Sequence, residues 1–246
     1  MTADIVWVDE AASTNSLLAS RCAELAHGAV IAARRQTAGR GQRGNSWESE
    51  PGANLTFSLL LRPKTITAVA QFELSMIVAL GVCDALTQAS GFNFCVKWPN
   101  DIYIGDKKIC GILIENSLEG RRIGRSIAGI GINVNQREFL SDAPNPVSLV
   151  NLTGKDLELE PLLESVCHTI LDRLEAYEAA PVPETLTAEY RSRLWRGQGF
   201  HLWKDAATGQ NYEAEIADVA VNGILTLRDR QNQHHAYAFK EVSAVL

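Results

Sequence analysis

The sequence predicts an α+β fold in which a mixed or antiparallel sheet with packed helices is followed by a small β-barrel. Up to about residue 195, segments with helical spacing of apolar residues alternate with strand-like apolar runs. After Trp195 only short alternating runs separated by polar turns remain. A chain of 246 residues suits one large domain with a smaller companion. We therefore expect two domains, residues 1–194 and 195–246.

The first 195 residues contain the signals for four helices and at least five strands. Ser13 or Thr14 is a candidate N-cap and Gly28 a stop for the first helix. The other helices are expected at residues 68–89, 160–179 and 183–195. Strands are expected at the runs AVIAARR, NLTFSLLLRP, FCVKW, KKICGILIE and RRIGRSIAGIGINVN. The last part, with GFHLWKDA, NYEAEIADVA, GILTLRDR and HAYAFKEVSAVL, predicts a barrel of about five strands.

Composition and charge argue against several classes of function. A formal net charge of −6 argues against a broad electrostatic surface for nucleic acid, and no helix-turn-helix fits before the first strand, so we expect no DNA binding. No apolar run approaches the ~20 residues of a membrane helix, and the acidic start does not resemble a signal peptide. Five cysteines without a C-x-x-C pair fit reduced thiols. We expect a cytoplasmic protein that has no membrane partner.

The loop QTAGRGQRGNSWES, residues 36–49, matches the dinucleotide fingerprint G-x-G-x-x-G at Gly39, Gly41 and Gly44. That fingerprint requires a helix directly after it and an acidic residue about twenty positions later. Here Pro51 and Gly52 stand where the helix would run, and LRPKT follows at the acidic position. No Walker A lysine follows either. A flexible loop with two arginines and an indole remains, and such a loop can close over phosphate or carboxylate oxygens.

A second polar cluster lies in VKWPNDIYIGDKKICGILIE. Lys97, Asn100, Asp101 and Lys108 surround an X-Pro turn that blocks helix formation. A carboxylate can hold Mg²⁺, and lysines can bind phosphate or carboxylate groups. The cluster therefore indicates nucleotide chemistry.

Six motifs together carry a resemblance to a known family. STN (residues 13–15), QTAGRGQRGNSW, GANL, KWPNDIY, KKICGILIE and GIGINVN stand in the order and at about the spacing found in the biotin–protein ligases (biotin–[acetyl-CoA-carboxylase] ligases). The specific part of the resemblance covers residues 5–135, and the C-terminal part resembles the SH3-like barrel of that family. Without an N-terminal winged helix, the chain is similar to the monofunctional members, which do not repress transcription.

The resemblance implies a two-step reaction. Biotin and ATP would form biotinyl-5′-AMP and pyrophosphate, with Mg²⁺ as the metal, and a lysine of a biotin carboxyl carrier protein domain, in acetyl-CoA carboxylase or a related carboxylase, would then accept the biotin. No covalent nucleophile on the enzyme is needed, so catalysis would consist of positioning and charge stabilisation.

The resemblance also implies roles for individual residues. Lys108 and Arg40 would be the catalytic residues, through charge stabilisation on the reacting oxygens. The biotin site would comprise Ser13, Thr14, Asn15, Gln36, Gly39, Arg40, Gly41, Lys108, Gly111 and Gly131. The ATP or adenylate site would comprise Arg40, Gln42, Arg43, Trp47, Asn100, Lys108 and Asn133. Asp101 would hold the metal.

The loop departs from the family pattern in one respect. Many members carry arginine two residues after the position of Arg40, whereas this chain has Gln42, and Asn45 stands where a further basic residue is common. Arg43 is the candidate for supplying the missing charge. Retention of the reactive adenylate depends on loop closure and water exclusion, so it is the property that this substitution affects.

Two other function classes stay open at this stage. A lipoate or octanoate ligase or transferase would share the fold, although a fatty acyl group does not need the polar set at residues 13–15 and Gln36. A module that binds biotin or nucleotide without turnover is the other alternative. A homodimer is open as well, because an edge strand at GINVN, residues 131–135, could pair across an interface.

Overall fold

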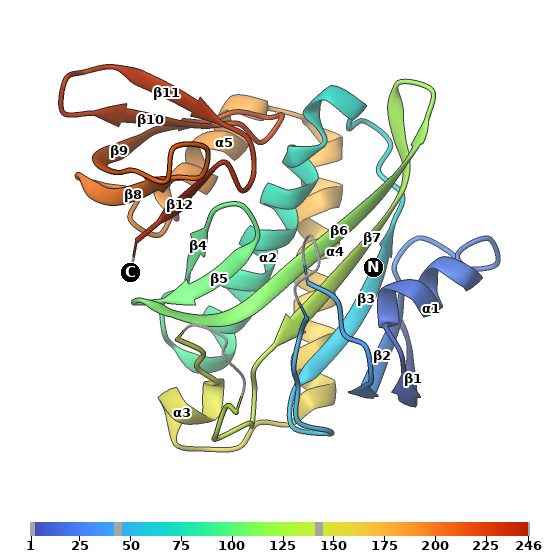
Figure 1. The fold of residues 1–246 in the computed structure, drawn as a ribbon. Helices are drawn as coiled ribbons and strands as arrows, with labels where there is room; N and C mark the ends of the chain where they lie inside the picture. Colours follow the sequence, from blue (N-terminus) through green and yellow to red (C-terminus); the bar gives the residue numbers. More distant parts are fainter. Residues whose placement is uncertain (1–2, 42–45, 141–144, 246) are drawn as a thin grey trace.

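The computed structural model describes residues 3–41, 46–140 and 145–245. They form a seven-stranded mixed sheet with helices and a five-stranded antiparallel sheet, which confirms the predicted fold class (Figure 1). The strands of the large sheet are β1 (Asp4–Ala11), β2 (Ala29–Gln36), β3 (Leu55–Leu61), β4 (Cys95–Lys97), β5 (Asp101–Ile104), β6 (Lys107–Glu119) and β7 (Arg122–Ile132). The helices are α1 (Thr14–Arg21), the 3₁₀ turn η2 (Ala68–Ala70), α2 (Phe72–Ser90), α3 (Leu149–Thr153), α4 (Leu159–Ala179) and α5 (Pro183–Ser192).

The strands of the large sheet lie in the order β1-β2-β3-β7-β6-β5-β4, and only the β1–β2 pair is parallel. The run GINVN begins at the end of β7, and β7 lies between β3 and β6. The expectation of an edge strand at this run is therefore wrong. The outer strands are β1 and β4, and β4 is partly covered because Leu194, which follows α5, forms a parallel bridge with Val96.

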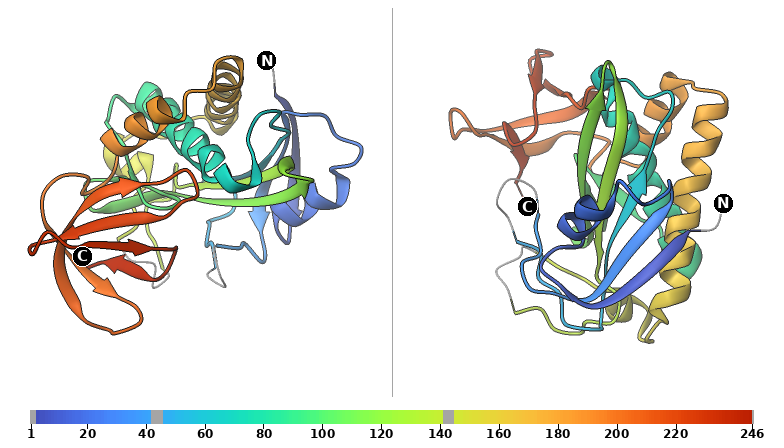
Figure 2. Two further views of the ribbon diagram at one scale, coloured as in Figure 1. Left: turned by 90° about the horizontal axis from the view of Figure 1, so that it is seen from above. Right: turned by 90° about the vertical axis from the view of Figure 1, so that its right-hand side faces the viewer.

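Helices cover both faces of the large sheet. Along β3, Leu59 and Leu61 belong to the main core with α2 and α4, whereas Leu60 packs with Leu18 and Cys22 on the side of α1. This alternation places α1 and α4 on opposite faces, as Figure 2 shows. All seven residues of β3 are buried because neither face meets water. The active-site candidates described below lie on the face of α1.

Helix α2 is apolar around much of its circumference because it packs inside the fold. By length and composition α2 could cross a membrane, so the expectation that no apolar run approaches the length of a membrane helix is wrong. Within the protein, however, 72% of its apolar window is buried. Gly81 lies against α4: a Cβ there would come 2.8 Å from the Ile170 side chain and 3.0 Å from its Cα. The glycine thus permits the close approach of α2 and α4.

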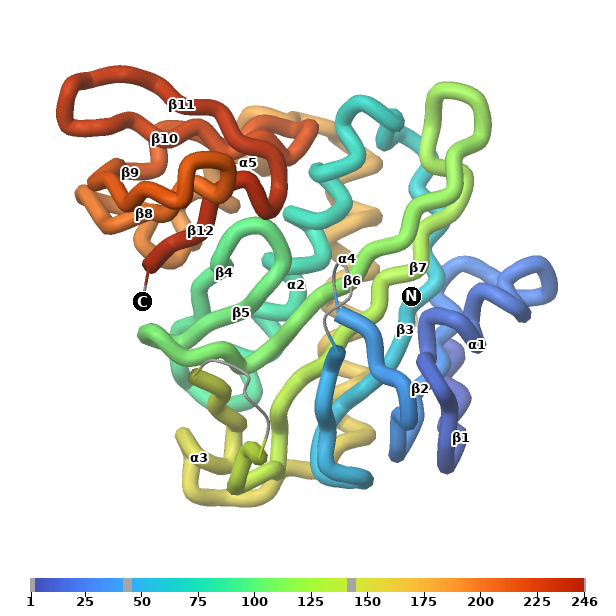
Figure 3. The backbone as a smooth tube through the Cα atoms, viewed as in Figure 1, coloured from blue at the N-terminus to red at the C-terminus, as the bar shows by residue number. Residues whose placement is uncertain are grey.

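The small sheet has the order β11-β10-β9-β8-β12. Its strands are β8 (His201–Asp205), β9 (Asn211–Val219), β10 (Leu225–Asp229), β11 (His234–Tyr237) and β12 (Val242–Ala244). The sheet is curled, since the Tyr237 hydroxyl of β11 donates to Asp205 of β8 across 3.2 Å although these strands are not neighbours. Figure 3 shows it beside β4 and β5, at the opposite end of the large sheet from α1 and β1.

One residue of the polar turn connects the two sheets. Trp98 donates from Nε1 to the Gly223 carbonyl (3.1 Å), and its ring meets Phe239 edge-on with centroids 6.1 Å apart. The small sheet therefore packs against the segment that carries Asn100 and Asp101. The boundary between residues 194 and 195 stays a prediction.

Several elements differ from the sequence expectations. Strands β1 and β5 and helix α3 were not expected, α1 ends at Arg21 rather than near Gly28, and HAYAFKEVSAVL contains two strands. β5 has only four residues and forms a hairpin with β6, a pairing that periodicity in so short a run does not reveal.

Candidate active site

A cavity of about 1160 Å³ opens on the face of the large sheet that carries α1. It is bounded by the start of α1, the loop after β2, strands β6 and β7, the turn before β5 and the edge of the small sheet. Of the predicted site residues that the structure describes, those lining it are Ser13, Thr14, Asn15, Gln36, Arg40, Gly41, Trp47, Asn100, Asp101, Lys108, Gly111, Gly131 and Asn133. Gly39 does not line it, and Gln42 and Arg43 lie outside the described residues.

Three glycines form the floor of this cavity. In the β6–β7 register Gly111 pairs with Gly131 and Leu113 with Gly129, so the three glycines lie next to one another on the sheet. A Cβ on Gly131 would come 2.3 Å from the Trp47 ring, and one on Gly129 would come 2.2 Å from Asn15 Oδ1. Flat groups can therefore lie directly on the backbone, where any side chain would collide with them. Gly129 was not among the predicted site residues, although its two-residue spacing from Gly131 puts it on the same face.

One end of the cavity is a buried polar network. The Thr14 backbone N–H donates to Gln36 Oε1 (2.8 Å), and the Thr14 hydroxyl lies 3.2 Å from the same oxygen. The Ser58 hydroxyl lies 2.6 Å from Asn15 Oδ1 and 2.8 Å from Thr14 Oγ1. Because Gln36 uses its oxygen within the protein, its amide N–H groups remain to donate to a ligand.

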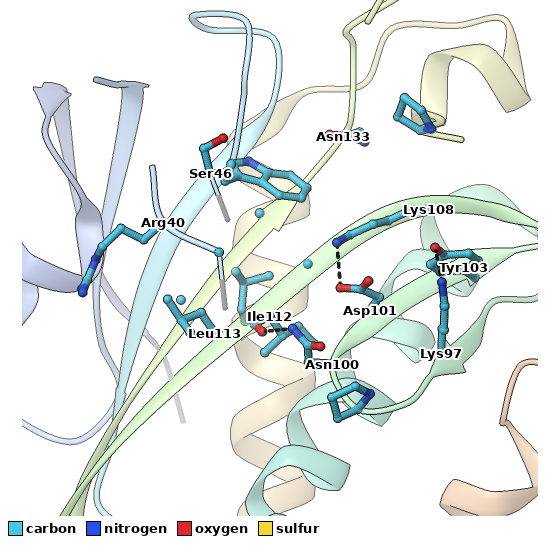
Figure 4. Close-up of a pocket in the computed structure, with 18 of the residues that line it drawn as sticks. Arg40, Ser46, Lys97, Asn100, Asp101, Tyr103, Lys108, Ile112, Leu113 and Asn133 are labelled. Carbon is cyan, nitrogen blue, oxygen red and sulfur yellow. Dashed lines mark hydrogen bonds and ion pairs between the residues drawn. The ribbon is translucent and has the colours of Figure 1, made fainter. Parts of the chain in front are cut away.

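In the loop between β2 and β3, the residues on either side of 42–45 pair with one another. Arg40 forms an antiparallel bridge with Ser46, and Trp47 N–H donates to the Gly39 carbonyl (3.0 Å). No helix follows among residues 48–54, which confirms that the glycine pattern is not a dinucleotide turn. The Arg40 guanidinium binds Glu115 at 3.1 Å and points away from Lys108 (Figure 4).

The other end of the cavity is charged. Lys108 Nζ lies 2.7 Å from Asp101 Oδ1, and neither side chain is more than 28% exposed. Lys97 Nζ lies 3.0 Å from the Tyr103 hydroxyl (Figure 4). It also lies 5.2 Å from the centre of the Trp195 ring. Burial lowers the pKa of Lys97, and Asp101 opposes that shift. Lys97 therefore carries a charge that is poorly solvated and that an anionic ligand would stabilise.

The backbone holds this charged end firmly. Asn100 donates from Nδ2 to the Ile112 carbonyl (2.7 Å), and Ile112 N–H donates back to the Asn100 carbonyl (3.0 Å). Asn133 donates to the Val147 carbonyl (3.1 Å), and Val147 N–H donates to the Lys108 carbonyl (2.9 Å). Both asparagine amides therefore fix the strands that carry the charged pair, and each keeps an oxygen for a ligand.

The cysteines whose pKa is shifted are not activated as nucleophiles. Burial raises the pKa of Cys95 to about 11 and of Cys83 and Cys167 to about 12, and that of Cys110 well above its ordinary value. These thiols stay protonated near neutral pH and are poor nucleophiles. What the cavity does offer is a polar end, a flat floor and two lysines, an arrangement that can orient an acid against a phosphate.

Comparison with known proteins gives the family. The model of the Biotin/lipoate A/B protein ligase family matches residues 8–133. A biotin--[acetyl-CoA-carboxylase] ligase of Paracoccus denitrificans is 34% identical over 185 residues, covering 69% of this chain and 74% of that protein. A bifunctional ligase/repressor BirA of Bacillus subtilis is 42% identical over 144 residues, covering 56% of this chain. The chain spans only 43% to 52% of the length of BirA proteins from Bacillus and Salmonella.

Solved structures of other proteins are similar to this chain over almost its whole length. A biotin protein ligase from Aquifex aeolicus, solved in complex with biotin and ATP, has a TM-score of 0.81 and 26% identity and covers 98% of both chains. The similarity therefore includes the small sheet as well as the cavity. The matched residues 8–133 contain every predicted site residue and make up more than half of the 246 residues, so the chain belongs to the Biotin/lipoate A/B protein ligase family.

Proposed function

We propose that this protein is an ATP-dependent biotin–protein ligase. It forms biotinyl-5′-AMP from biotin and ATP and then transfers biotin to a lysine of a carrier domain. The Paracoccus denitrificans relative is a biotin--[acetyl-CoA-carboxylase] ligase, and the Aquifex aeolicus structure is a biotin protein ligase in complex with biotin and ATP. The proposal extends these activities to this chain.

A single observation carries the proposal: one cavity joins a buried polar end to a cationic end across a floor of glycines. Ser13, Thr14, Asn15 and Gln36 meet the needs of the ureido group of biotin, which has both donors and acceptors. Lys108 and Lys97 meet the needs of a carboxylate and a triphosphate. A volume of about 1160 Å³ exceeds that of most single-ligand sites and leaves room for both substrates.

In the first step a biotin carboxylate oxygen attacks the α-phosphorus of ATP, and the bond to the bridging oxygen breaks to release pyrophosphate. Lys108 stabilises the charge on the reacting oxygens, and Arg40 turns from Glu115 to the carboxylate and phosphate. The Arg40–Glu115 pair is 41% to 47% exposed and hence weak, so this exchange costs little. Gln42 and Arg43 belong to the part of the loop that would cover the adenylate, and Trp47, Asn100 and Asn133 would line the nucleotide site.

Magnesium fits this site only together with the nucleotide. The described residues contain no group of three or more His, Cys, Asp or Glu side chains that could hold a metal. Asp101 offers one carboxylate, and Mg²⁺ in nucleotide sites takes one or two carboxylates plus phosphate oxygens and water. Mg²⁺ bound in this way would neutralise triphosphate charge.

In the second step the neutral amine of a carrier lysine attacks the acyl carbon, and the bond to AMP breaks. Two relatives are named as ligases of acetyl-CoA carboxylase. We therefore propose the biotin carboxyl carrier domain of that enzyme or of a related carboxylase as the acceptor. A cytoplasmic location and a homodimer both remain predictions.

Intact-mass measurement of a carrier domain tests the complete function. The purified protein is incubated with the carrier, Mg²⁺, ATP and either biotin or lipoate. We expect one added biotin that requires ATP, with the acceptor lysine changed to Arg as the control that stays unmodified. Addition of lipoate in preference to biotin would reverse the substrate assignment, and no addition with either acid would leave only a binding protein.

A further inference from the structure

Glu115 contacts two parts of the site without lining the cavity itself. It lies on β6, and its Oε2 accepts a hydrogen bond from Asn15 Nδ2 (2.7 Å) and one from the Arg40 guanidinium (3.1 Å). Asn15 is 3% exposed and Glu115 lies 100 residues further along the chain, so the contact exists only in the folded protein. One carboxylate oxygen thus joins the start of α1 to the loop after β2.

An amide such as Asn15 can be turned over with almost no change in shape, so its neighbours decide where its oxygen lies. The Ser58 hydroxyl on one side can donate or accept, so it does not determine the orientation of the amide. On the other side, Nδ2 meets two groups that only accept, the Glu115 carboxylate at 2.7 Å and the Leu113 carbonyl at 3.4 Å. Both require Nδ2 to face them and Oδ1 to face Ser58, and Glu115 is the closer and the charged one of the two. At the far end of the network, the Thr14 backbone N–H fixes Gln36 in the same way, because it only donates.

The orientation matters because the Asn15 amide belongs to the cavity wall. It lies flat against the bare backbone of Gly129, where a Cβ would come 2.2 Å from Oδ1. Turning the amide over would exchange a donor for an acceptor next to the polar end of the ligand. The Arg40 guanidinium shares the same Glu115 oxygen, but this exposed ion pair is weak, so Glu115 keeps its contact with Asn15 when Arg40 turns to the substrates.

We propose that Glu115 is a positioning residue that selects the orientation of the Asn15 amide and thereby the affinity for the acid substrate. The proposal rests on the proposed function, because the readout is biotin use. Glu115 acts through Asn15, so its removal affects the acid more than ATP.

The test compares three variants in ATP–pyrophosphate exchange. Glu115→Ala removes the acceptor and raises KM for biotin about tenfold, the effect of losing one hydrogen bond to a charged group, while KM for ATP changes much less. Glu115→Gln keeps an acceptor for Asn15 but loses the charge that Arg40 pairs with, and it restores most of the biotin affinity. Glu119→Ala, on the exposed end of the same strand, is the matched control and behaves like wild type.

A double-variant cycle gives the decisive result. If Glu115 acts through Asn15, Glu115→Ala causes no further loss of biotin affinity in an Asn15→Ala background. Additive losses, or a Glu115→Gln variant as impaired as Glu115→Ala, would overturn the proposal. Wild-type protein that shows no biotin-dependent exchange would instead refute the proposed function, so the two failures are distinguishable.

Discussion

Replacing Gly129 by Ala should damage the acid site and leave the nucleotide site largely intact. An added Cβ would lie 2.2 Å from Oδ1, 2.8 Å from Cγ and 3.0 Å from Nδ2 of Asn15, too close for any of these atoms. The Asn15 amide is held between Ser58 and Glu115, so a Cβ at these distances displaces it and breaks both hydrogen bonds. Each broken bond costs about 1–3 kcal/mol.

The same figures give the expected kinetics. KM for biotin should rise about 10- to 100-fold, corresponding to one buried or charge-assisted hydrogen bond, with a far smaller change in KM for ATP. ATP–pyrophosphate exchange at varied biotin and ATP concentrations measures both values, and urea unfolding measures the accompanying loss of stability. Removing the Asn15 side chain relieves the clash, so the double variant should be no worse than Asn15→Ala alone. A Gly129→Ala variant with wild-type KM for biotin would refute the geometry of the polar end.

Three further outcomes follow from ionisable residues. Lys108→Ala should lower the adenylation rate about 100-fold at saturating substrates, because one charge-stabilising donor is lost; rapid-quench adenylate formation measures this, and a normal rate would exclude the assigned role. Burial lowers the pKa of Lys97, so its charge is lost as the pH rises through that lowered pKa. KM for ATP should therefore rise at a lower pH in wild type than in Lys97→Arg, and identical profiles would contradict the role of Lys97. Burial also lowers the pKa of His27 below 6.5, and its Nδ1 accepts the Arg62 N–H. Below about pH 6.5 the unfolded chain then binds more protons than the folded one, so the free energy of unfolding should decrease as the pH is lowered. Urea unfolding should show a smaller decrease in His27→Gln. An equal decrease in both proteins would contradict the buried neutral ring.

The sequence alone was sufficient for the elements with strong local signals. The apolar runs that became β2, β3, β6 and β7, and the long helices α2 and α4, have periodicities that differ clearly from their surroundings. Strand order was not accessible in this way. GINVN was expected at an edge, yet β7 pairs on both sides, with β3 and β6, through contacts between distant parts of the chain.

The same distinction between local signals and long-range contacts applies to the site residues. The ordered motifs identified residues from Ser13 to Asn133 that the structure brings into one cavity, with Gly39 at the base of the loop instead. Ser58 was missed because it stands inside the apolar run NLTFSLLLRP, where nothing local marks a polar role. Glu115 was missed because its partners lie 75 and 100 residues away in the sequence. It also stands at the end of the run KKICGILIE, where a charged residue is typical of a solvent-exposed strand end.

The central claim is that one cavity activates an acid with ATP, and ATP–pyrophosphate exchange tests it most directly. Purified protein is assayed with Mg²⁺, labelled pyrophosphate and either biotin, lipoate or no added acid. The account predicts exchange that requires biotin, because the polar end at Asn15 and Gln36 suits a ureido group and the charged end at Lys108 suits a carboxylate and phosphates. Exchange with lipoate alone would contradict the acid assignment, and absence of exchange with either acid would contradict catalysis by this cavity.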